Sequence, residues 1–140
     1  MAPRSNAIGK LREIIEQEGD PKEVLLSSIG DLSNCPVARS QVLVATHAGE
    51  KFHAGTKILR TDKDLVEQQY QGSVGLVVKL GLGAFENARN LDFHGFKANI
   101  GDWVLTRPAD GLQLYINQVP CRLFDDVNIL MLVDDPQRFW

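Results

Sequence analysis

The sequence is poor in cysteine and has no long apolar run, and each shortage restricts what the chain can be. Its 140 residues include only two cysteines, Cys35 and Cys121, without a C-x-x-C spacing. Isolated cysteines of this kind predict reduced thiols in a cytosolic protein, while a disulfide between them stays open as the alternative. No apolar run approaches the roughly 20 residues that a membrane-spanning helix needs. The first residues carry charges within their apolar part, so no secretory signal peptide is predicted.

The chain also lacks a strong excess of charge and the usual patterns of catalytic residues. A net charge of −3 argues against a general nucleic-acid binder and against a basic membrane-surface protein. His47, His53 and His94 have no cysteine nearby, so we expect solvated loop histidines and no metal site. The pairs Asp125-Asp126 and Asp134-Asp135 are expected to be turn residues and solubilising charges. Nothing marks a nucleophile, and we predict neither an enzyme nor a cofactor.

The N-terminal part of the sequence predicts two helices. Apolar residues recur at helical spacing over residues 5–18, and a second helix is expected to start at once. Asp20 can cap it, Pro21 suits its first position, and its apolar face continues to about Leu32. Together they predict an N-terminal helical extension over residues 1–34, whose apolar face must be covered by the rest of the chain or by a partner.

After this extension the pattern changes to short strands separated by Gly, Asp and Pro. Strands are predicted at residues 41–45, 74–80, 103–106, 112–116, 119–124 and 129–133. The second of them shows little alternation, which predicts burial on both faces. Residues 108–111, Pro-Ala-Asp-Gly, have the chemistry of a hairpin connection. This spacing favours a mainly β protein built as a small closed β-barrel.

Two longer segments interrupt the strands. Residues 47–71 are rich in polar residues and glycine, and a loop of this length in a small domain is usually functional or disordered. Residues 84–97 carry Phe85, Leu91, Phe93 and Phe96 among polar residues. Between the two lies the pair Gly81 and Gly83, for which a sharp turn is expected. A phosphate-binding loop would need a third glycine followed by a helix start.

In this order, the pieces resemble the GroES family of co-chaperonins over about residues 36–136. The matching pieces are a proline before the first strand, an apolar tripeptide in a mobile loop, a G-x-V-x-x-V-G-x-G strand and turn, a V-G-D-x-V turn and a terminal I-L-A-x-V strand. They fall here on Pro36, on Thr56-Lys57-Ile58-Leu59, on Gly75, Val77, Gly81 and Gly83, on Ile100-Gly101-Asp102-Trp103-Val104, and on residues 128–133.

The resemblance implies a GroES-like β-barrel domain over residues 35–140 that follows the helical extension. It further implies a homo-oligomeric ring, of seven subunits in that family, which caps a GroEL-like chaperonin ring through the loop at residues 47–71. In such a loop Ile58 and Leu59 would dock in an apolar groove of the partner; the alternative is that they form an ordinary strand of their own barrel. The implied location is the cytoplasm, and neither nucleic acid nor a membrane is implied as a partner.

Other features depart from the family or extend it. Phe85, Leu91, Phe93 and Phe96 lie where the family has a roof hairpin, so they either contact neighbouring subunits or pack back on the barrel. Phe139 and Trp140 are expected to form a docking tail. The additional helices and Lys57 within the tripeptide suggest a bacteriophage-encoded relative. The second hypothesis is accordingly a phage structural protein, such as a capsid-stabilising or head-assembly subunit of the virion.

Overall fold

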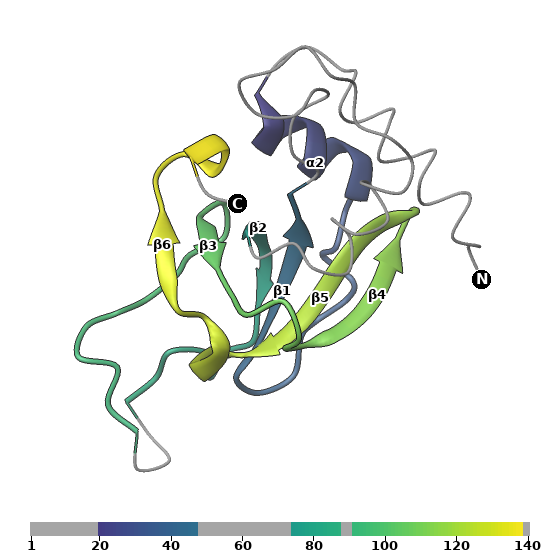
Figure 1. The fold of residues 1–140 in the computed structure, drawn as a ribbon. Helices are drawn as coiled ribbons and strands as arrows, with labels where there is room; N and C mark the ends of the chain where they lie inside the picture. The colour runs from purple at the N-terminus through teal and green to yellow at the C-terminus, as the bar shows by residue number, and fades with distance from the viewer. Residues whose placement is uncertain (1–19, 48–73, 88–90, 139–140) are drawn as a thin grey trace.

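The computed structural model of the chain describes residues 20–47, 74–87 and 91–138, which form a mainly β structure (Figure 1). Within these ranges there are six strands, one α-helix and two short 3-10 helices. In chain order they are α2 (Pro21–Ile29), β1 (Gln41–Thr46), β2 (Val74–Leu80), β3 (Trp103–Leu105), β4 (Leu112–Ile116), β5 (Val119–Asp125), η1 (Asp126–Asn128), β6 (Met131–Val133) and η2 (Pro136–Arg138).

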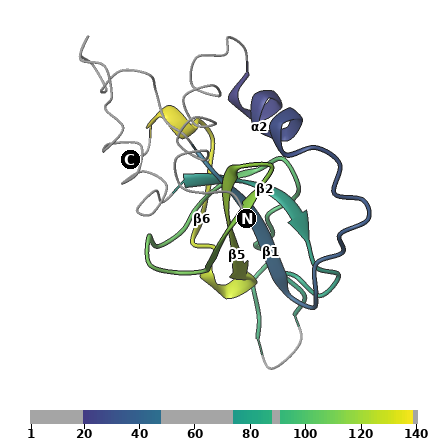
Figure 2. The ribbon, with the colours of Figure 1, turned by 90° about the vertical axis from the view of Figure 1, so that its right-hand side faces the viewer.

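All six strands belong to one antiparallel sheet in the order β4-β5-β1-β2-β3-β6. The mainly β fold predicted from the sequence is confirmed. Across the described residues the sheet is not closed into a barrel, because β4 and β6 each pair with one strand only. Figures 1 and 2 show the strongly twisted sheet with α2 lying across one end of it.

The centre of the sheet is formed by β1 between β5 and β2. A register shift between Leu43 and Val44 bends β1 against β2. The first five residues of β2 are all buried, as its unbroken apolar sequence predicts. Gly75 permits this close approach, since a Cβ there would clash with the Val44 side chain and the Ala45 carbonyl group.

Each face of the sheet has its own core. We call the side covered by α2 the helix face and the opposite side the loop face. The helix face buries Leu25 and Ile29 of α2 against Leu43, Ala45, Val74, Leu76, Val78, Trp103, Val119, Cys121 and Val133. The loop face buries Val42, Val44, Val77, Val104 and Phe124 of the strands beneath Ala84, Phe85, Ala98 and Ile129 of the connecting segments.

Helix α2 starts as the sequence predicts. Asp20 is its N-cap and accepts a hydrogen bond from the Lys22 backbone N–H at 3.1 Å, and Pro21 occupies the first turn. The helix ends at Ile29 and not at Leu32, because Gly30 adopts φ +86°, a left-handed conformation that stops it. The helix predicted over residues 5–18 lies outside the described residues. None of the described helices is long and apolar enough to cross a membrane.

Two connections differ from the sequence-based prediction. Residues 108–111 do form a turn, but they do not join a hairpin, since β3 already has β2 and β6 on its two sides. The chain therefore crosses to the far edge, where β4 pairs with β5. The last strand begins at Met131 and not at residue 129, because η1 and the turn after it occupy the preceding residues.

Both cysteines are free thiols, as expected, which removes the disulfide alternative. Cys35 is exposed, whereas Cys121 lies fully buried on the helix face. Burial raises the pKa of Cys121 to about 12, so its thiol stays protonated at neutral pH.

Candidate functional site

The predicted partner-binding loop leaves the sheet between β1 and β2. Its proposed docking residues, Thr56, Lys57, Ile58 and Leu59, lie outside the described residues. The structure shows where the segment is anchored: the His47 backbone N–H donates to the Val74 carbonyl oxygen at 3.0 Å. His47 and Val74, which flank residues 48–73 in the sequence, are therefore held side by side as an extension of the β1–β2 pairing.

His47 itself is buried and not solvated, which corrects the expectation from the sequence. Only 4% of it is exposed, and its ring meets the indole of Trp103 edge-on, with ring centroids 5.3 Å apart. The contact joins the loop anchor to β3. His53 lies outside the described residues, and the exposed His94 lies beside Asp92, as expected for a loop histidine.

The Gly81-x-Gly83 motif forms the sharp turn that the sequence predicts. The backbone N–H groups of Gly81 and Gly83 donate to the carbonyl oxygens of Gln41 and Arg39, both at 2.9 Å. A Cβ at Gly81 would clash with the Arg39 carbonyl group, so glycine is needed for this close approach. Since both N–H groups are occupied by the chain itself, the turn does not present them to a phosphate.

The Gly101-Asp102 motif forms a second turn, directly beside β2. Gly101 has φ +96°, and its N–H donates to the Val77 carbonyl oxygen at 2.8 Å. The Asp102 side chain accepts a hydrogen bond from the Asn99 backbone N–H at 2.8 Å, which fixes the turn from inside. The Gly81-x-Gly83 turn thus follows the end of β2, whereas the Gly101-Asp102 turn lies against the middle of this strand at Val77.

The aromatic segment packs largely on the sheet. Phe85 is 7% exposed, and its ring contacts those of Phe93 and Phe96 edge-on, at centroid distances of 5.5 and 5.9 Å. Phe93 and Phe96 pack against the core of the loop face, whereas Leu91 is exposed. This arrangement leaves Leu91, alone among the four predicted contact residues, largely available at the surface. The tail residues Phe139 and Trp140 lie outside the described part of the chain.

Asp126 was not identified as a structural residue from the sequence, where it resembled a solubilising turn residue. It is 1% exposed, and its Oδ2 accepts a hydrogen bond from the Phe85 backbone N–H at 2.9 Å. Phe85 has φ +62°, an uncommon conformation for an aromatic residue. The buried carboxylate therefore anchors the start of the aromatic segment in this strained geometry.

Arg122 is a second buried polar residue whose burial was not predicted from the sequence. It is 4% exposed on β5, directly opposite Val44, and burial lowers the pKa of its guanidinium group. The sequence around it, Val-Pro-Cys-Arg-Leu-Phe, gives no sign of a buried position, because arginine at a strand site usually faces solvent.

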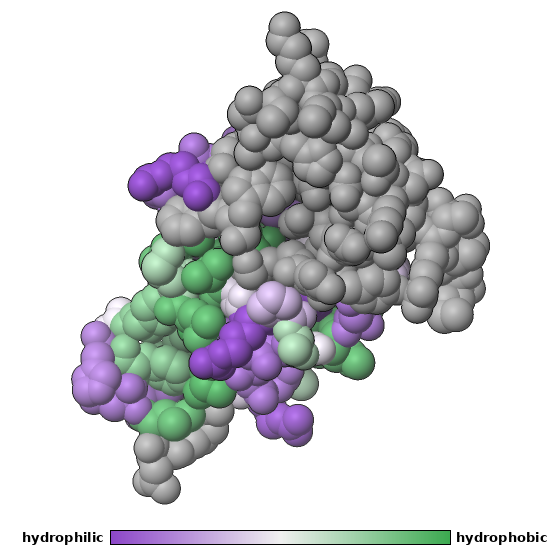
Figure 3. Space-filling view, viewed as in Figure 1, coloured by the Kyte–Doolittle hydropathy of each residue, from purple (hydrophilic) through white to green (hydrophobic). Residues whose placement is uncertain are grey.

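An apolar surface follows the edge strand β6. Leu130, Met131 and Leu132 are 43%, 38% and 43% exposed, and Val127 just before them is 50% exposed. Figure 3 shows hydrophobic residues gathered on this side of the molecule. We call these four residues the β6 apolar edge. Among the described strands, none pairs with the outer side of β6.

No protein-family model matches the chain, and no curated protein is significantly similar to it in sequence. Within the described ranges, no group of three or more His, Cys, Asp or Glu side chains is placed to hold a metal ion. The functional proposal therefore depends on the geometry described above and on the order of the sequence motifs.

Proposed function

We propose that the chain is a divergent, GroES-like co-chaperonin of the cytoplasm that forms an oligomeric ring and caps a chaperonin through residues 47–71. The observation that carries the proposal is the anchor of that segment. The hydrogen bond between His47 and Val74 and the burial of His47 against Trp103 hold both ends of the segment on a rigid sheet. An apolar pair such as Ile58 and Leu59 can then engage a partner without disturbing the core.

Two further features support this assignment. The antiparallel strand order and the bulge in β1 support a curved sheet, which a GroES-like barrel requires, although the described strands leave the sheet open. The β6 apolar edge favours assembly, since an exposed apolar edge strand invites pairing with another chain unless it is covered. In a ring, several loops would bind together, and multivalency would strengthen a weak single contact.

The test is sedimentation of the purified protein with a bacterial chaperonin, with and without adenine nucleotide. We expect co-sedimentation only with nucleotide, and its loss in the double variant Ile58→Ser/Leu59→Ser. The matched control is Leu82→Ser/Leu112→Ser, which removes two aliphatic side chains that are 99% and 66% exposed elsewhere on the surface. Binding that survives the loop substitutions, or that is lost equally in the control, would refute the docking mechanism.

A phage structural subunit is the second candidate, and the open sheet favours it. Both β4 and β6 offer an unpaired side among the described strands, which suits a subunit that joins neighbours at two edges. Limited proteolysis before and after assembly distinguishes the candidates. A co-chaperonin ring should be cleaved selectively between Gly49 and Gln71, whereas a structural subunit should protect that segment once assembled.

A further inference from the structure

The turn that leads into β4 contains the pair Asp110-Gly111. Among the aspartates and asparagines of the sequence, no other is followed by glycine. Such a pair can react with itself, because the backbone nitrogen of the glycine can attack the side-chain carboxyl carbon of the aspartate. Glycine favours this attack, since it has no Cβ that obstructs the approach. Neither of the functions proposed above depends on this pair.

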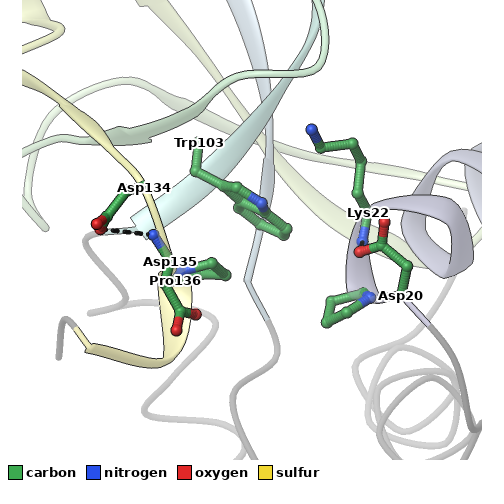
Figure 4. Close-up of a pocket in the computed structure, with 7 residues that line it drawn as sticks. Asp20, Lys22, Trp103, Asp134, Asp135 and Pro136 are labelled. Atoms are coloured by element: carbon green, nitrogen blue, oxygen red, sulfur yellow. Dashed lines mark hydrogen bonds between the residues drawn. The ribbon is translucent and has the colours of Figure 1, made fainter.

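The carboxyl group of Asp110 is held less firmly than those of most described aspartates. Its Oδ2 is shielded from solvent but accepts no hydrogen bond from the described residues. It lies 3.8 Å from the guanidinium group of Arg107, whose side chain is 67% exposed, so this ion pair is weak. Hydrogen bonds hold the carboxyl groups of Asp20, Asp31, Asp92, Asp102, Asp125, Asp126 and Asp134. Figure 4 shows one further bond of this kind, in which Asp134 accepts the Asp135 backbone N–H at 2.7 Å. The Asp110 carboxyl group can therefore turn towards Gly111 without breaking a hydrogen bond to a described residue.

The backbone N–H of Gly111 is not part of the β4–β5 ladder. The two-residue turn between these strands makes Ile116 and Val119 a hydrogen-bonded pair. Hydrogen-bonded and non-hydrogen-bonded pairs alternate from there, which places Gly111 at a non-hydrogen-bonded position that faces Phe124. Within the described ranges, no other backbone carbonyl group accepts the Gly111 N–H. The nitrogen is thus available to the neighbouring carboxyl group.

We propose that Asp110-Gly111 is a site of spontaneous isomerisation to isoaspartate. The Gly111 nitrogen bonds to the side-chain carboxyl carbon of Asp110, and the carboxyl hydroxyl leaves with the amide proton as water. The product is a five-membered succinimide ring, which a second water molecule opens. Attack at the side-chain carbonyl restores aspartate, whereas attack at the main-chain carbonyl leaves the chain running through the side chain of residue 110. One water is released and one is consumed, so the isomerisation needs no other reactant.

The isomerised chain does not fit the present packing of the turn. A Cβ at Gly111 would come within 2.7 Å of the ring of Phe124, so the glycine lies close against this buried side chain. The isoaspartate linkage adds one carbon atom to the backbone directly before this contact. Gly111 then has to move away from Phe124, and the start of β4 separates from β5. The modification therefore weakens the core of the loop face.

The test is prolonged incubation of the purified full chain in mildly acidic buffer, in which the reactive, neutral form of a carboxyl group is better populated. Isoaspartate is located by peptide mapping with a protease that cleaves before aspartate but not before isoaspartate. Its total is measured by methyl transfer from S-adenosylmethionine with an isoaspartyl methyltransferase. We expect isoaspartate at residue 110 to form about tenfold faster than at any other described aspartate, and Asp110→Glu, which would need a six-membered ring, to abolish most methylation. Faster reaction at another described aspartate, or none at residue 110, would overturn the proposal.

Val127→Gly supplies a matched control, because it creates a second Asp-Gly pair at Asp126. Val127 is 50% exposed, whereas the Asp126 carboxyl group is buried and accepts the Phe85 backbone N–H. In the folded variant, residue 126 should isomerise about tenfold more slowly than residue 110, and in urea the two rates should become equal. Equal rates in the folded variant would overturn the role assigned to the weakly held carboxyl group of Asp110.

The isomerised protein tests the structural consequence. Once separated from the parent protein by ion-exchange chromatography, it should unfold at a lower urea concentration, because Gly111 has left its contact with Phe124. Hydrogen exchange should accelerate at the backbone amides of β4 and not in α2. An unchanged unfolding midpoint with unchanged exchange would refute the displacement of this turn.

Discussion

The two faces of the sheet are covered in different ways. On the helix face, α2 places Leu25 and Ile29 on the strands by apolar contact, and its own backbone is satisfied by the helix and its cap. On the loop face, segments without regular secondary structure cover the strands. Their backbone groups need a hydrogen-bond partner inside the structure. That partner is the buried carboxylate of Asp126, which accepts the N–H of Phe85.

The difference shows which additional hydrogen bonds are needed when a loop, and not a helix, covers a core. A helix satisfies its backbone hydrogen bonds internally, so it can cover a core with apolar side chains alone. A loop that packs on a core brings unpaired N–H and C=O groups with it, and these require polar partners in a buried place. The loop face therefore contains a buried aspartate that holds its covering segment, whereas α2 covers the helix face with the apolar side chains of Leu25 and Ile29. The following predictions test this contrast, beginning with the largest effect.

Phe124→Ala should be the most damaging change. Phe124 is 1% exposed at the centre of the loop face, and truncating a buried phenylalanine costs about 3–5 kcal/mol of unfolding free energy. Urea unfolding followed by far-ultraviolet circular dichroism measures the change. Leu112→Ala, at an exposed position of the neighbouring strand β4, is the control and should lie close to the parent protein. A loss below about 1 kcal/mol for Phe124→Ala would mean that the loop face is not a packed core.

Asp126→Ala should come next, with a loss of about 1–3 kcal/mol, because it leaves the buried N–H of Phe85 without its acceptor. Asp126→Asn keeps an acceptor oxygen and should lose less. Hydrogen exchange at the Phe85 amide should accelerate more in the alanine variant than in the asparagine variant. If both variants matched the parent protein in stability and exchange, the carboxylate would not be the anchor of this face.

Asp20→Ala should weaken the helix face by about 1 kcal/mol, since it removes the cap of α2. Asp20→Ser retains a capping oxygen and serves as the matched control. Thiol labelling of Cys121, which the helix face buries, reports whether α2 detaches more often. Faster labelling in the alanine variant alone is the expected result; identical labelling in all three proteins would contradict it.

The smallest effect concerns pH and Asp31, which follows α2. Hydrogen bonds from the backbone N–H and hydroxyl of Ser33 lower the pKa of this carboxyl group below its ordinary value of 3.8. A lowered pKa in the folded state means that the ionised form stabilises folding. That contribution is present above pH 3.8 and is lost as the pH falls through the lower folded value. Asp31→Asn should remove this part of the acid dependence in pH-resolved thermal unfolding, and an unchanged profile would contradict the assignment.

Strands and turns were largely predictable because their signals are local. The strand of residues 74–80 is unbroken and apolar. The predicted strands 112–116 and 119–124 leave two residues between them, Asn117 and Gln118, and both have positive φ, as a two-residue hairpin requires. The start of α2 was equally local, since Asp20 and Pro21 specify it within two residues.

The predictions were wrong where contacts between residues that are distant in sequence determine the structure. Whether residues 108–111 join a hairpin depends on β6 having already taken the free side of β3, which no local pattern reveals. His47 is buried because Trp103, far away in sequence, packs against it. Asp126 has the composition of a turn residue, and its burial follows from the path of the aromatic segment above it. The candidate site was thus predictable in its turns but not in its buried polar groups.

The closure between His47 and Val74 has a consequence for how this protein can change over evolution. Because the two strand ends are joined by the sheet itself, the entropy of closing the intervening segment grows only slowly with its length, by about 0.6 kcal/mol for each doubling. Insertions, deletions and wholesale exchange of residues 48–73 therefore leave the scaffold nearly untouched. The same sheet can in this way acquire new binding specificities by exchange of residues 48–73 alone. The sequence of this segment can therefore diverge faster than the sequences of β1 and β2.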